Sequence, residues 1–341
     1  MQNSTKFAMA VLGAGLALGI RRRFRRRDIR GQTALITGSS RGLGYLMARE
    51  YARRGCRVVI CARDEQELEI ARARLIDEGA EVLSVVCDVS DEQQVEVLID
   101  AATRHFGQID ILVNNAGIIQ VGPIESQTPQ DFEDALGVIF YGTLYPILSV
   151  LPQMMERGDG RIVNITSVGA RLSFPHLLPY NCAKYATRGL SQGLRAELKR
   201  FGISVTTVVP GLMRTGSFAN ALFKGRREGE LAWFSLGSSM PLVSMNARRA
   251  ARRIVEASRR RRSEYVVGAP AKIAAAFAGR FPGFTADLLG AVNNLFLPAA
   301  EGSQGEVLTG KAVRNQFDGP LSRLVDMGTT LGRRAGHRLN Q

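Results

Sequence analysis

Cysteine and histidine are scarce in this sequence, and their spacing excludes several kinds of site. The four cysteines lie scattered, with no CxxC pair. This pattern indicates neither a zinc site nor a disulfide framework, and it fits a reducing compartment. The three histidines, His105, His176 and His337, form no ligand cluster, so each is interpreted as a surface or structural residue. The sequence therefore predicts no metal site.

Acidic residues are also in deficit, with 31 Asp and Glu against 45 Lys and Arg, a net charge of +14. Two segments hold the whole excess: residues 1–30 and residues 248–262 each carry eight basic residues and one acidic residue, or +7. No basic stripe is interleaved with aromatic residues, so nucleic acid is not expected as a partner. Segment 248–262 is interpreted as a solvated helix face, a contact with anionic lipid, or a docking site for an acidic acyl carrier.

One apolar run, Phe7–Ile20, precedes the first arginine cluster. As a helix its fourteen residues span about 21 Å, short of the roughly 30 Å hydrocarbon core of a bilayer. A secretory signal has the opposite order of charge and apolar run, so secretion is not expected. Arginines at this place bind anionic headgroups and keep the following domain cytoplasmic. We interpret residues 1–30 as a membrane anchor or interfacial helix; the alternative is a frayed tail.

From Gly31 onward, short β-branched runs alternate with amphipathic stretches of helical length. This alternation predicts a single Rossmann-type, doubly wound α/β domain with a parallel seven-stranded sheet. The predicted strands are 33–37, 57–61, 81–86, 110–113, 161–166, 203–209 and 264–268.

A glycine-rich turn follows the first predicted strand, in the segment TGSSRGLG of residues 37–44. Gly38, Gly42 and Gly44 permit a tight strand-to-helix turn and a close approach of the backbone to a phosphate. The N–H groups at the start of the next helix are oriented donors for such an anion. Because the turn lies between a strand and a helix, we interpret it as a dinucleotide-binding turn rather than a plain loop.

The end of the second predicted strand is where a residue selects between the two nicotinamide dinucleotides. An acidic residue there favours a free ribose 2′-hydroxyl. This chain has Arg63 instead, with Arg41 in the glycine turn. Two guanidinium groups suit a 2′-phosphate, so NADP(H) is predicted in preference to NAD(H); the alternative is that one of the two arginines only points into water. Asp88, after the third strand, is a candidate acceptor for the adenine amino group.

Ser167, Tyr180 and Lys184 offer a hydroxyl, a phenol and an ammonium within eighteen residues. Tyr180 and Lys184 are four residues apart and so share one face of a helix. An ammonium close to the phenol favours the phenolate and is expected to lower the pKa of Tyr180. These features make Tyr180 a candidate proton donor and acceptor.

Six motifs together resemble those of the classical short-chain dehydrogenase/reductase family. They are Thr37–Gly44, Asp88–Val89, Asn114–Gly117, Ser167, Tyr180–Lys184 and Pro210–Thr215, in the family's order and spacing. The resemblance covers about residues 31–270 and leaves 271–341 as a C-terminal extension. It implies a Rossmann-type fold, a nicotinamide cofactor of the NADP(H) type, and interconversion of carbonyls and alcohols. We also expect a homodimer.

The resemblance also implies roles for residues. Tyr180 would protonate the substrate oxygen, Lys184 would hold the nicotinamide ribose and lower the pKa of the tyrosine, and Ser167 would donate a hydrogen bond to the carbonyl oxygen. The predicted cofactor-binding residues are Gly38, Ser40, Arg41, Gly42, Leu43, Gly44, Arg63, Asp88, Val89, Asn115, Ala116, Gly117, Tyr180, Lys184, Pro210, Gly211, Met213 and Thr215.

One position departs from the family's pattern. The family usually has an Asn twenty-five residues after the first Asn of NNAG, where it helps seat a water that links the lysine to solvent. Here that residue is Ile139. Either the proton path differs, or turnover is slower, or the natural step does not need this relay. An active enzyme is expected.

Residues 211–246, which include the only tryptophan, Trp233, match the family's substrate lid. With Leu172, Phe174, Leu177 and Leu178 they suggest an apolar pocket for a lipophilic carbonyl or alcohol, unless the side chains only pack the lid onto the domain. The expected function is an NADPH-dependent reductase at the cytoplasmic face of a membrane. The alternatives are a 3-oxoacyl reductase of carrier-bound chains and a poorly catalytic NADP(H)-binding sensor or scaffold.

The extension is predicted to hold helices at 272–281 and 284–297, split by Pro282 and Gly283, and a short helix near 321–331. Its apolar helices would cap the pocket, lie on a membrane or obstruct a subunit interface.

Overall fold

The computed structural model describes residues 28–241, 244–299, 307–316, 328–330, 332, 334–336 and 339. The predicted anchor, residues 7–20, lies outside the described residues.

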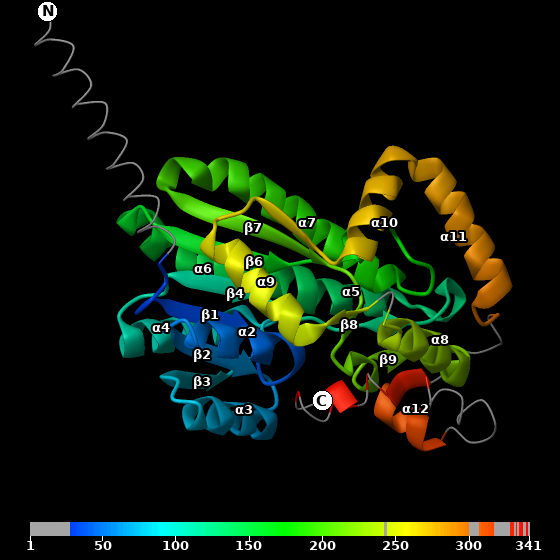
Figure 1. The fold of residues 1–341 in the computed structure, drawn as a ribbon, viewed down its shortest axis with the longest axis horizontal. Coiled ribbons are helices and arrows are strands. Elements are labelled where there is room, and N and C mark those ends of the chain that lie inside the picture. The colour runs from blue at the N-terminus through cyan, green and yellow to red at the C-terminus, as the bar shows by residue number, and fades with distance from the viewer. Residues whose placement is uncertain are drawn as a thin grey trace, which may run out of the picture.

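A parallel seven-stranded sheet forms the centre of the described domain (Figure 1). Its order is β11-β7-β6-β4-β1-β2-β3, so the chain moves outward from β1 in one direction and then returns to continue in the other. The strands are β1 Thr33–Thr37, β2 Arg57–Ala62, β3 Val82–Val86, β4 Ile111–Asn114, β6 Gly160–Ile165, β7 Ile203–Pro210 and β11 Glu264–Val267. The predicted Rossmann-type fold is confirmed, and every predicted strand of this sheet is present within one or two residues of its expected bounds.

Helices cover both faces of this sheet. The helices are α2 Gly42–Ala52, α3 Glu65–Asp77, α4 Glu92–Phe106, α5 Pro129–Leu136, α6 Gly142–Arg157, α7 Leu178–Leu198 and α9 Ala247–Arg259. Helices α2, α3 and α9 share one apolar core with Ala34 and Ile36 of β1. Helices α4, α6 and α7 share the other with Leu35. Successive side chains of a strand point to opposite faces, so the near-continuous apolar runs of the sequence follow from burial on both sides.

The lid and the C-terminal extension form smaller elements beside the carboxyl ends of the strands. They are β5 Gln120–Val121, β8 Met213–Arg214, β9 Leu222–Phe223, α8 Arg227–Ser239, β10 Met245–Asn246, α10 Ala269–Arg280, α11 Pro282–Phe296, β12 Leu308–Thr309 and α12 Gly310–Gln316. The order β12-β9-β5 shows that the extension adds a strand to a small sheet with the lid. The sequence did not predict β12 or α12, because residues 298–320 are polar and rich in glycine and were expected to form a loop. The helix predicted near 321–331 lies mostly outside the described residues.

One helical stretch among the described residues, Pro129–Arg157, is long and apolar enough to cross a membrane by length and composition. It comprises α5, a π-helical turn at Gly137–Tyr141 and α6. Ile147, Val150 and Met154 of α6 pack into the core of the sheet, as those of a core helix in a soluble protein do. This stretch is therefore weak evidence for a membrane span.

Candidate active site

Ser167, Tyr180 and Lys184 meet at the carboxyl end of β6. Ser167 precedes a short 3₁₀ turn at Val168–Ala170, and its Oγ accepts a hydrogen bond from the Gly169 N–H at 3.0 Å. Tyr180 and Lys184 lie in the first turns of α7, and the Lys184 Nζ is 5.7 Å from the centroid of the Tyr180 ring. Ser167 and Tyr180 are also neighbours, because a Cβ on Gly169 would lie 3.4 Å from both Ser167 Oγ and Tyr180 Cε1. The structure thus gathers the three predicted catalytic groups.

Burial controls the ionisation of this trio. Burial raises the pKa of Tyr180, and the neighbouring Ser167 hydroxyl opposes that rise. The expectation that Lys184 sets a low pKa for Tyr180 is therefore wrong for the chain by itself, because desolvation of the phenolate dominates. Burial also lowers the pKa of Lys184 to about 8. Its Nζ donates a hydrogen bond to the Ile165 carbonyl oxygen at 2.9 Å.

Ile139 lies beside this ammonium. It is fully buried in the π-helical turn between α5 and α6 and packs in a small cluster with Ala183 and Tyr180. A Cβ on Gly117 would lie 3.6 Å from Ile139 Cγ1 and 3.7 Å from Lys184 Nζ, so both side chains border the same backbone. The π-turn widens the helix where the family usually has an Asn. An apolar side chain there cannot accept a proton from Lys184 or hold a water beside it.

The glycine turn has the geometry that a bound pyrophosphate needs. Gly38 and Gly42 have φ of 60° and 58°, where a side chain is strained. A Cβ on Gly38 would lie 2.8 Å from Ala116 Cα. Thr37 Oγ1 accepts hydrogen bonds from the N–H groups of Asn115 and Ala116, at 2.9 and 3.1 Å. These contacts hold Asn115 and Ala116 against the turn, and together with Ser40, Leu43 and Gly44 the segment fits a dinucleotide.

The C-terminal segment also reaches this turn, which the sequence did not indicate. The Leu339 carbonyl oxygen accepts a hydrogen bond from the Gly42 N–H at 2.9 Å, at the first residue of α2. Leu339 is buried in the core that includes α2. Gly336 of this segment packs closely against Gly216 of the lid: a Cβ on Gly216 would lie only 2.6 Å from the Gly336 Cα. The segment therefore connects the lid with the glycine turn.

The two arginines predicted at the ribose are both paired with acids. Arg41 Nη1 is 2.5 Å from Glu67 Oε1, and Arg63 Nη1 is 3.5 Å from Asp88 Oδ2. Ser40 Oγ also donates to Glu67, at 3.3 Å. The Arg63 side chain is 63% exposed and so is free to turn toward a ligand. Sequence reasoning missed Glu67, because nothing in the sequence indicated that α3 faces the glycine turn.

The remaining predicted cofactor residues lie near the carboxyl ends of β3 and β7. Val89 is buried against Gly142 at the start of α6. The Gly211 N–H donates to the Val267 carbonyl oxygen at 3.2 Å, and a Cβ on Gly211 would lie 2.8 Å from the Ala271 Cβ. The Thr215 N–H donates to the Met213 carbonyl oxygen at 3.0 Å. Pro210 ends β7, so this segment begins the lid at the edge where Ser167 lies.

A buried carboxylate ties the lid helix α8 to the loop between Ser167 and Tyr180. Glu230 is fully buried; its two oxygens lie 2.6 Å from His176 Nδ1 and 2.6 Å from Trp233 Nε1. His176 has φ of 61°, a left-handed conformation for a non-glycine residue. The Trp233 ring stacks on Phe174 with centroids 6.4 Å apart. His176 thus has the structural role that the sequence suggested, whereas Glu230 was not predicted.

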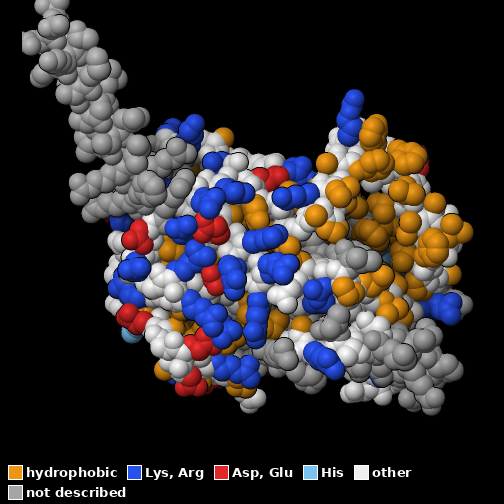
Figure 2. Space-filling model, viewed as in Figure 1, with side chains coloured by type: hydrophobic (Ala, Val, Ile, Leu, Met, Phe, Trp, Pro, Cys, Tyr) orange, Lys and Arg blue, Asp and Glu red, His pale blue; other side chains and the backbone are white. Residues whose placement is uncertain are grey.

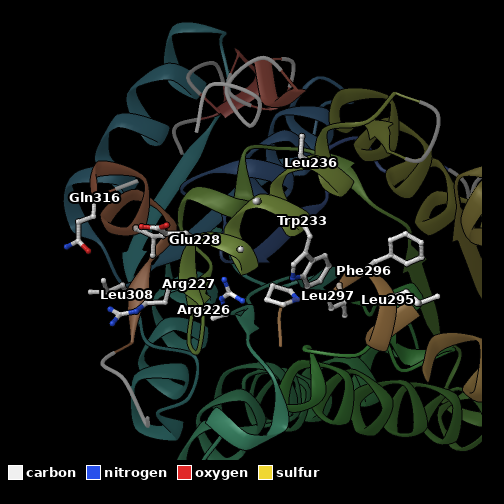
Figure 3. A pocket seen from close by; sticks show the side chains of 14 residues that line it. Arg226, Arg227, Glu228, Trp233, Leu236, Leu295, Phe296, Leu297, Leu308 and Gln316 are labelled. Carbon is white, nitrogen blue, oxygen red and sulfur yellow. The ribbon is translucent and has the colours of Figure 1, made fainter. Parts of the chain in front are cut away.

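A cavity of about 770 Å³ lies between α8 and the end of α11 (Figure 3). Its lining includes Trp233, Leu236, Leu295 and Phe296, with Arg226 at one side. None of Ser167, Tyr180 and Lys184 lines it. Much of the lid's apolar surface instead packs in a cluster of its own with Val121, Phe223 and Phe234. This cavity is therefore not the predicted substrate pocket, because it contains lid residues but none of Leu172, Phe174, Leu177 and Leu178; the predicted pocket stays a prediction.

Comparison with known proteins identifies relatives of this fold. The family model described as short chain dehydrogenase matches residues 32–224. Gluconate 5-dehydrogenase of Gluconobacter oxydans is 35% identical over 188 residues, which cover 55% of this chain and 73% of that protein.

Two solved structures are similar as well. A gluconate 5-dehydrogenase from Burkholderia cenocepacia, in complex with NADP and tartrate, has a TM-score of 0.63 and 31% identity, covering 73% of this chain and 98% of that one. A variant of actinorhodin polyketide ketoreductase with NADPH has a TM-score of 0.61 and 28% identity, covering 69% and 95%.

Proposed function

The chain belongs to the short chain dehydrogenase family, an NAD(P)-dependent oxidoreductase family, and from this premise we propose that it is an NADPH-dependent reductase of a lipophilic ketone. In the reverse direction it would oxidise the corresponding alcohol. The observation that carries the proposal is the meeting of Ser167, Tyr180 and Lys184 beside a glycine turn that only glycines fit.

In this proposal, the nicotinamide supplies the hydride that reaches the carbonyl carbon. The Tyr180 hydroxyl delivers a proton to the carbonyl oxygen, so one hydride and one proton convert the ketone to the alcohol. The raised pKa of Tyr180 keeps the phenol protonated at neutral pH, as reduction requires. The Ser167 hydroxyl, which lies next to Tyr180, stabilises negative charge that develops on the same oxygen. The Lys184 ammonium offers its remaining N–H groups to the ribose and its charge to the tyrosinate left after proton transfer.

Preference for NADPH over NADH is part of the proposal. Arg63 follows the second strand and is exposed, and Arg41 lies in the glycine turn; together they would hold a 2′-phosphate. Glu67 now pairs with Arg41 and would have to release it. We expect Arg63→Ala to weaken NADPH binding and leave NADH binding nearly unchanged, in calorimetric titrations with both cofactors. Equal affinities of the native chain for NADH and NADPH would contradict this assignment.

Two other functions remain to be separated from this one. A reductase of carrier-bound 3-oxoacyl chains is favoured by the likeness to the polyketide ketoreductase, and by the exposed Arg248, Arg249, Arg252 and Arg253 of α9, which suit an acidic carrier. Rates on acyl-carrier substrates and on free ketones would distinguish the two. A cofactor-binding sensor with poor turnover is favoured by Ile139, and calorimetric binding without turnover of any substrate would support it.

We also propose a division of the chain into three segments, a membrane association and a homodimer. Residues 1–30 anchor it to the cytoplasmic face of a membrane, residues 31–270 form the catalytic domain, and residues 271–341 extend it. Deletion of residues 1–27 should weaken the association of the protein with membranes, and a native chain that is already in the supernatant would exclude the anchor. A homodimer is proposed through α6 and the π-helical turn before it, where the exposed Tyr141, Leu148 and Met155 recur every seven residues. Light scattering on native and Leu148→Asp protein tests it.

A further inference from the structure

The hairpin of α10 and α11 carries an exposed apolar surface (Figure 2). On α10, Ile273 is 72% exposed and the exposed Phe277 follows it at helical spacing; the exposed Phe281 comes directly after the helix. On α11, Phe284, Leu288 and Leu295 continue the stripe, and Leu295 and Phe296 are each 74% exposed. Helix α11 has no buried residue at all. With about 200 Å² for each large side chain, the exposed fractions of these seven residues correspond to roughly 840 Å², above the 300–600 Å² of the largest apolar patch on a typical monomer.

These side chains form one continuous surface. The Phe277 ring lies 5.3 Å from that of Phe281 and 6.0 Å from that of Phe284, between centroids, so aromatic contacts bridge the two helices at the turn. Phe284, Leu288 and Leu295 are spaced by four and seven residues and so share one face of α11. Asp287 and Asn294 lie on a neighbouring face. The hairpin is thus amphipathic by position, with its apolar side open to solvent.

Charge at the border of this surface favours an anionic partner. Both helices are fully described, and they carry Lys272 and Arg280 against Asp287. The Arg280 guanidinium lies 5.7 Å from the Phe281 centroid, so its stem runs along the aromatic surface while its charge stays at the edge. Aromatic and aliphatic side chains on one face with cations at the border are the pattern of helices that lie in a membrane interface.

A second copy of the chain fits this surface less well. The hairpin projects from the domain as a convex ridge rather than a groove (Figures 1 and 2). A two-fold contact through the ridge would bring the same Lys272 and Arg280 of two copies together, and like charges oppose such a pairing. The stripe itself offers no polar side chain, whereas protein interfaces of this size carry about ten hydrogen bonds.

We propose that the α10–α11 hairpin docks the protein on an anionic lipid bilayer, with the apolar stripe among the acyl chains and Lys272 and Arg280 at the headgroups. The docking is separate from the anchor proposed at residues 7–20 and does not depend on the proposed reaction. It places the active site near the lipid, because α10 packs directly behind the lid: Ala271 touches Gly211, and Gly211 follows β7 at the edge where Ser167 lies. A ketone dissolved in the bilayer would then reach the site from the membrane side.

The test uses the full chain with an environment-sensitive dye on single cysteines. Cys182 is the only exposed native cysteine among the four, so Cys182→Ser gives a background that does not react when folded. Leu288→Cys and Leu295→Cys place the dye on the apolar stripe. Asp287→Cys and Asn294→Cys are matched controls on the adjacent residues. Vesicles contain phosphatidylcholine with phosphatidylserine, or phosphatidylcholine alone, and a second set carries brominated acyl chains as a quencher.

With anionic vesicles, we expect a blue shift at residues 288 and 295 and quenching by brominated chains about twofold or more above that at 287 and 294, since interfacial helices are immersed by about 5–10 Å on one side only. Omission of phosphatidylserine, or Lys272→Gln with Arg280→Gln, should reduce the signal. Equal signals at stripe and control positions would overturn the proposal, even if the chain binds vesicles through its N-terminus. So would a blue shift that needs no lipid and grows with protein concentration, which identifies a second copy as the partner.

Discussion

Replacing Lys184 by Met is expected to abolish turnover and yet stabilise the protein. Lys184 is 5% exposed, and burial lowers its pKa from 10.5 to about 8. A shift of this size corresponds to about 3 kcal/mol of free energy that opposes the charged form in the folded state. Met has a similar volume and no charge, so the variant loses this cost. It also loses the hydrogen bond to the Ile165 carbonyl, which contributes about 1 kcal/mol. The net expectation at pH 7 is a gain of about 2 kcal/mol.

The pH dependence of this gain follows from the same shift. Between pH 8 and pH 10.5 the unfolded chain holds a proton on Lys184 that the folded chain has released. The free energy of unfolding of the native protein therefore rises with pH across this window, on account of this group. The advantage of the variant is largest below pH 8 and falls as pH approaches 10.5. Above that value only the loss of the hydrogen bond remains, and the variant becomes slightly less stable than the native protein.

Guanidinium chloride unfolding of both proteins, at neutral and at alkaline pH, measures these differences. Lys184→Arg is the control that keeps a charge, and it should not stabilise the protein. A Lys184→Met variant less stable than the native chain at pH 7 would refute the reasoning, as would a gain that does not change with pH. Either result would mean that the ammonium is solvated or paired in solution in a way that offsets its burial.

Three further changes test other parts of the site. Ile139→Asn places an amide beside Lys184, which should raise the pKa of the lysine and move the alkaline limb of the reductase pH profile to higher pH by about one unit. Ile139→Val is the control. An unchanged profile in the Asn variant would show that residue 139 does not affect the ionisation of Lys184. Ending the chain at Gly336 removes the Leu339 carbonyl from the Gly42 N–H and should tighten NADPH binding several-fold in calorimetry, whereas removal of residues 340–341 alone should not. Glu230→Gln weakens the link that Glu230 forms between His176 and Trp233, so we expect a loss of about 1–3 kcal/mol in the free energy of unfolding and a higher KM with little change in kcat. The control is the exposed Glu228→Gln, which should have no effect. A change in kcat alone would contradict a positioning role for Glu230.

The sequence predicted the sheet well because each strand is an apolar β-branched run that parallel packing buries on both faces. The sequence also predicted that Tyr180 and Lys184 lie near Ser167. Ser167 follows the end of a strand, and Tyr180 and Lys184 share one face of the next helix. The sequence could not predict Glu67 or Glu230, since neither follows a pattern: each is defined by packing between segments far apart in the chain. The predicted direction of the Tyr180 pKa shift was wrong for a similar reason. A spacing of four residues places Lys184 near Tyr180, but it does not show that the phenol is buried.

The position of the C-terminal segment was the largest difference. Residues after 298 have little apolar periodicity, so nothing in the sequence indicated that β12 pairs with β9 or that Leu339 reaches the glycine turn. Small residues also let this part of the chain approach the lid closely, as Gly336 does at Gly216 and Gly310 does at the Phe218 carbonyl. Such contacts are fixed by tertiary packing rather than by local propensity.

The central claim is that Ser167, Tyr180 and Lys184 reduce a carbonyl with hydride from NADPH. Its most direct test is the rate of NADPH oxidation, followed by absorbance, with native and Tyr180→Phe protein on steroid, retinoid, acyl and small aliphatic carbonyls. We predict turnover of at least one lipophilic carbonyl by the native protein and a loss of about 10²-fold or more in the variant. Turnover that survives in Tyr180→Phe would contradict the claim.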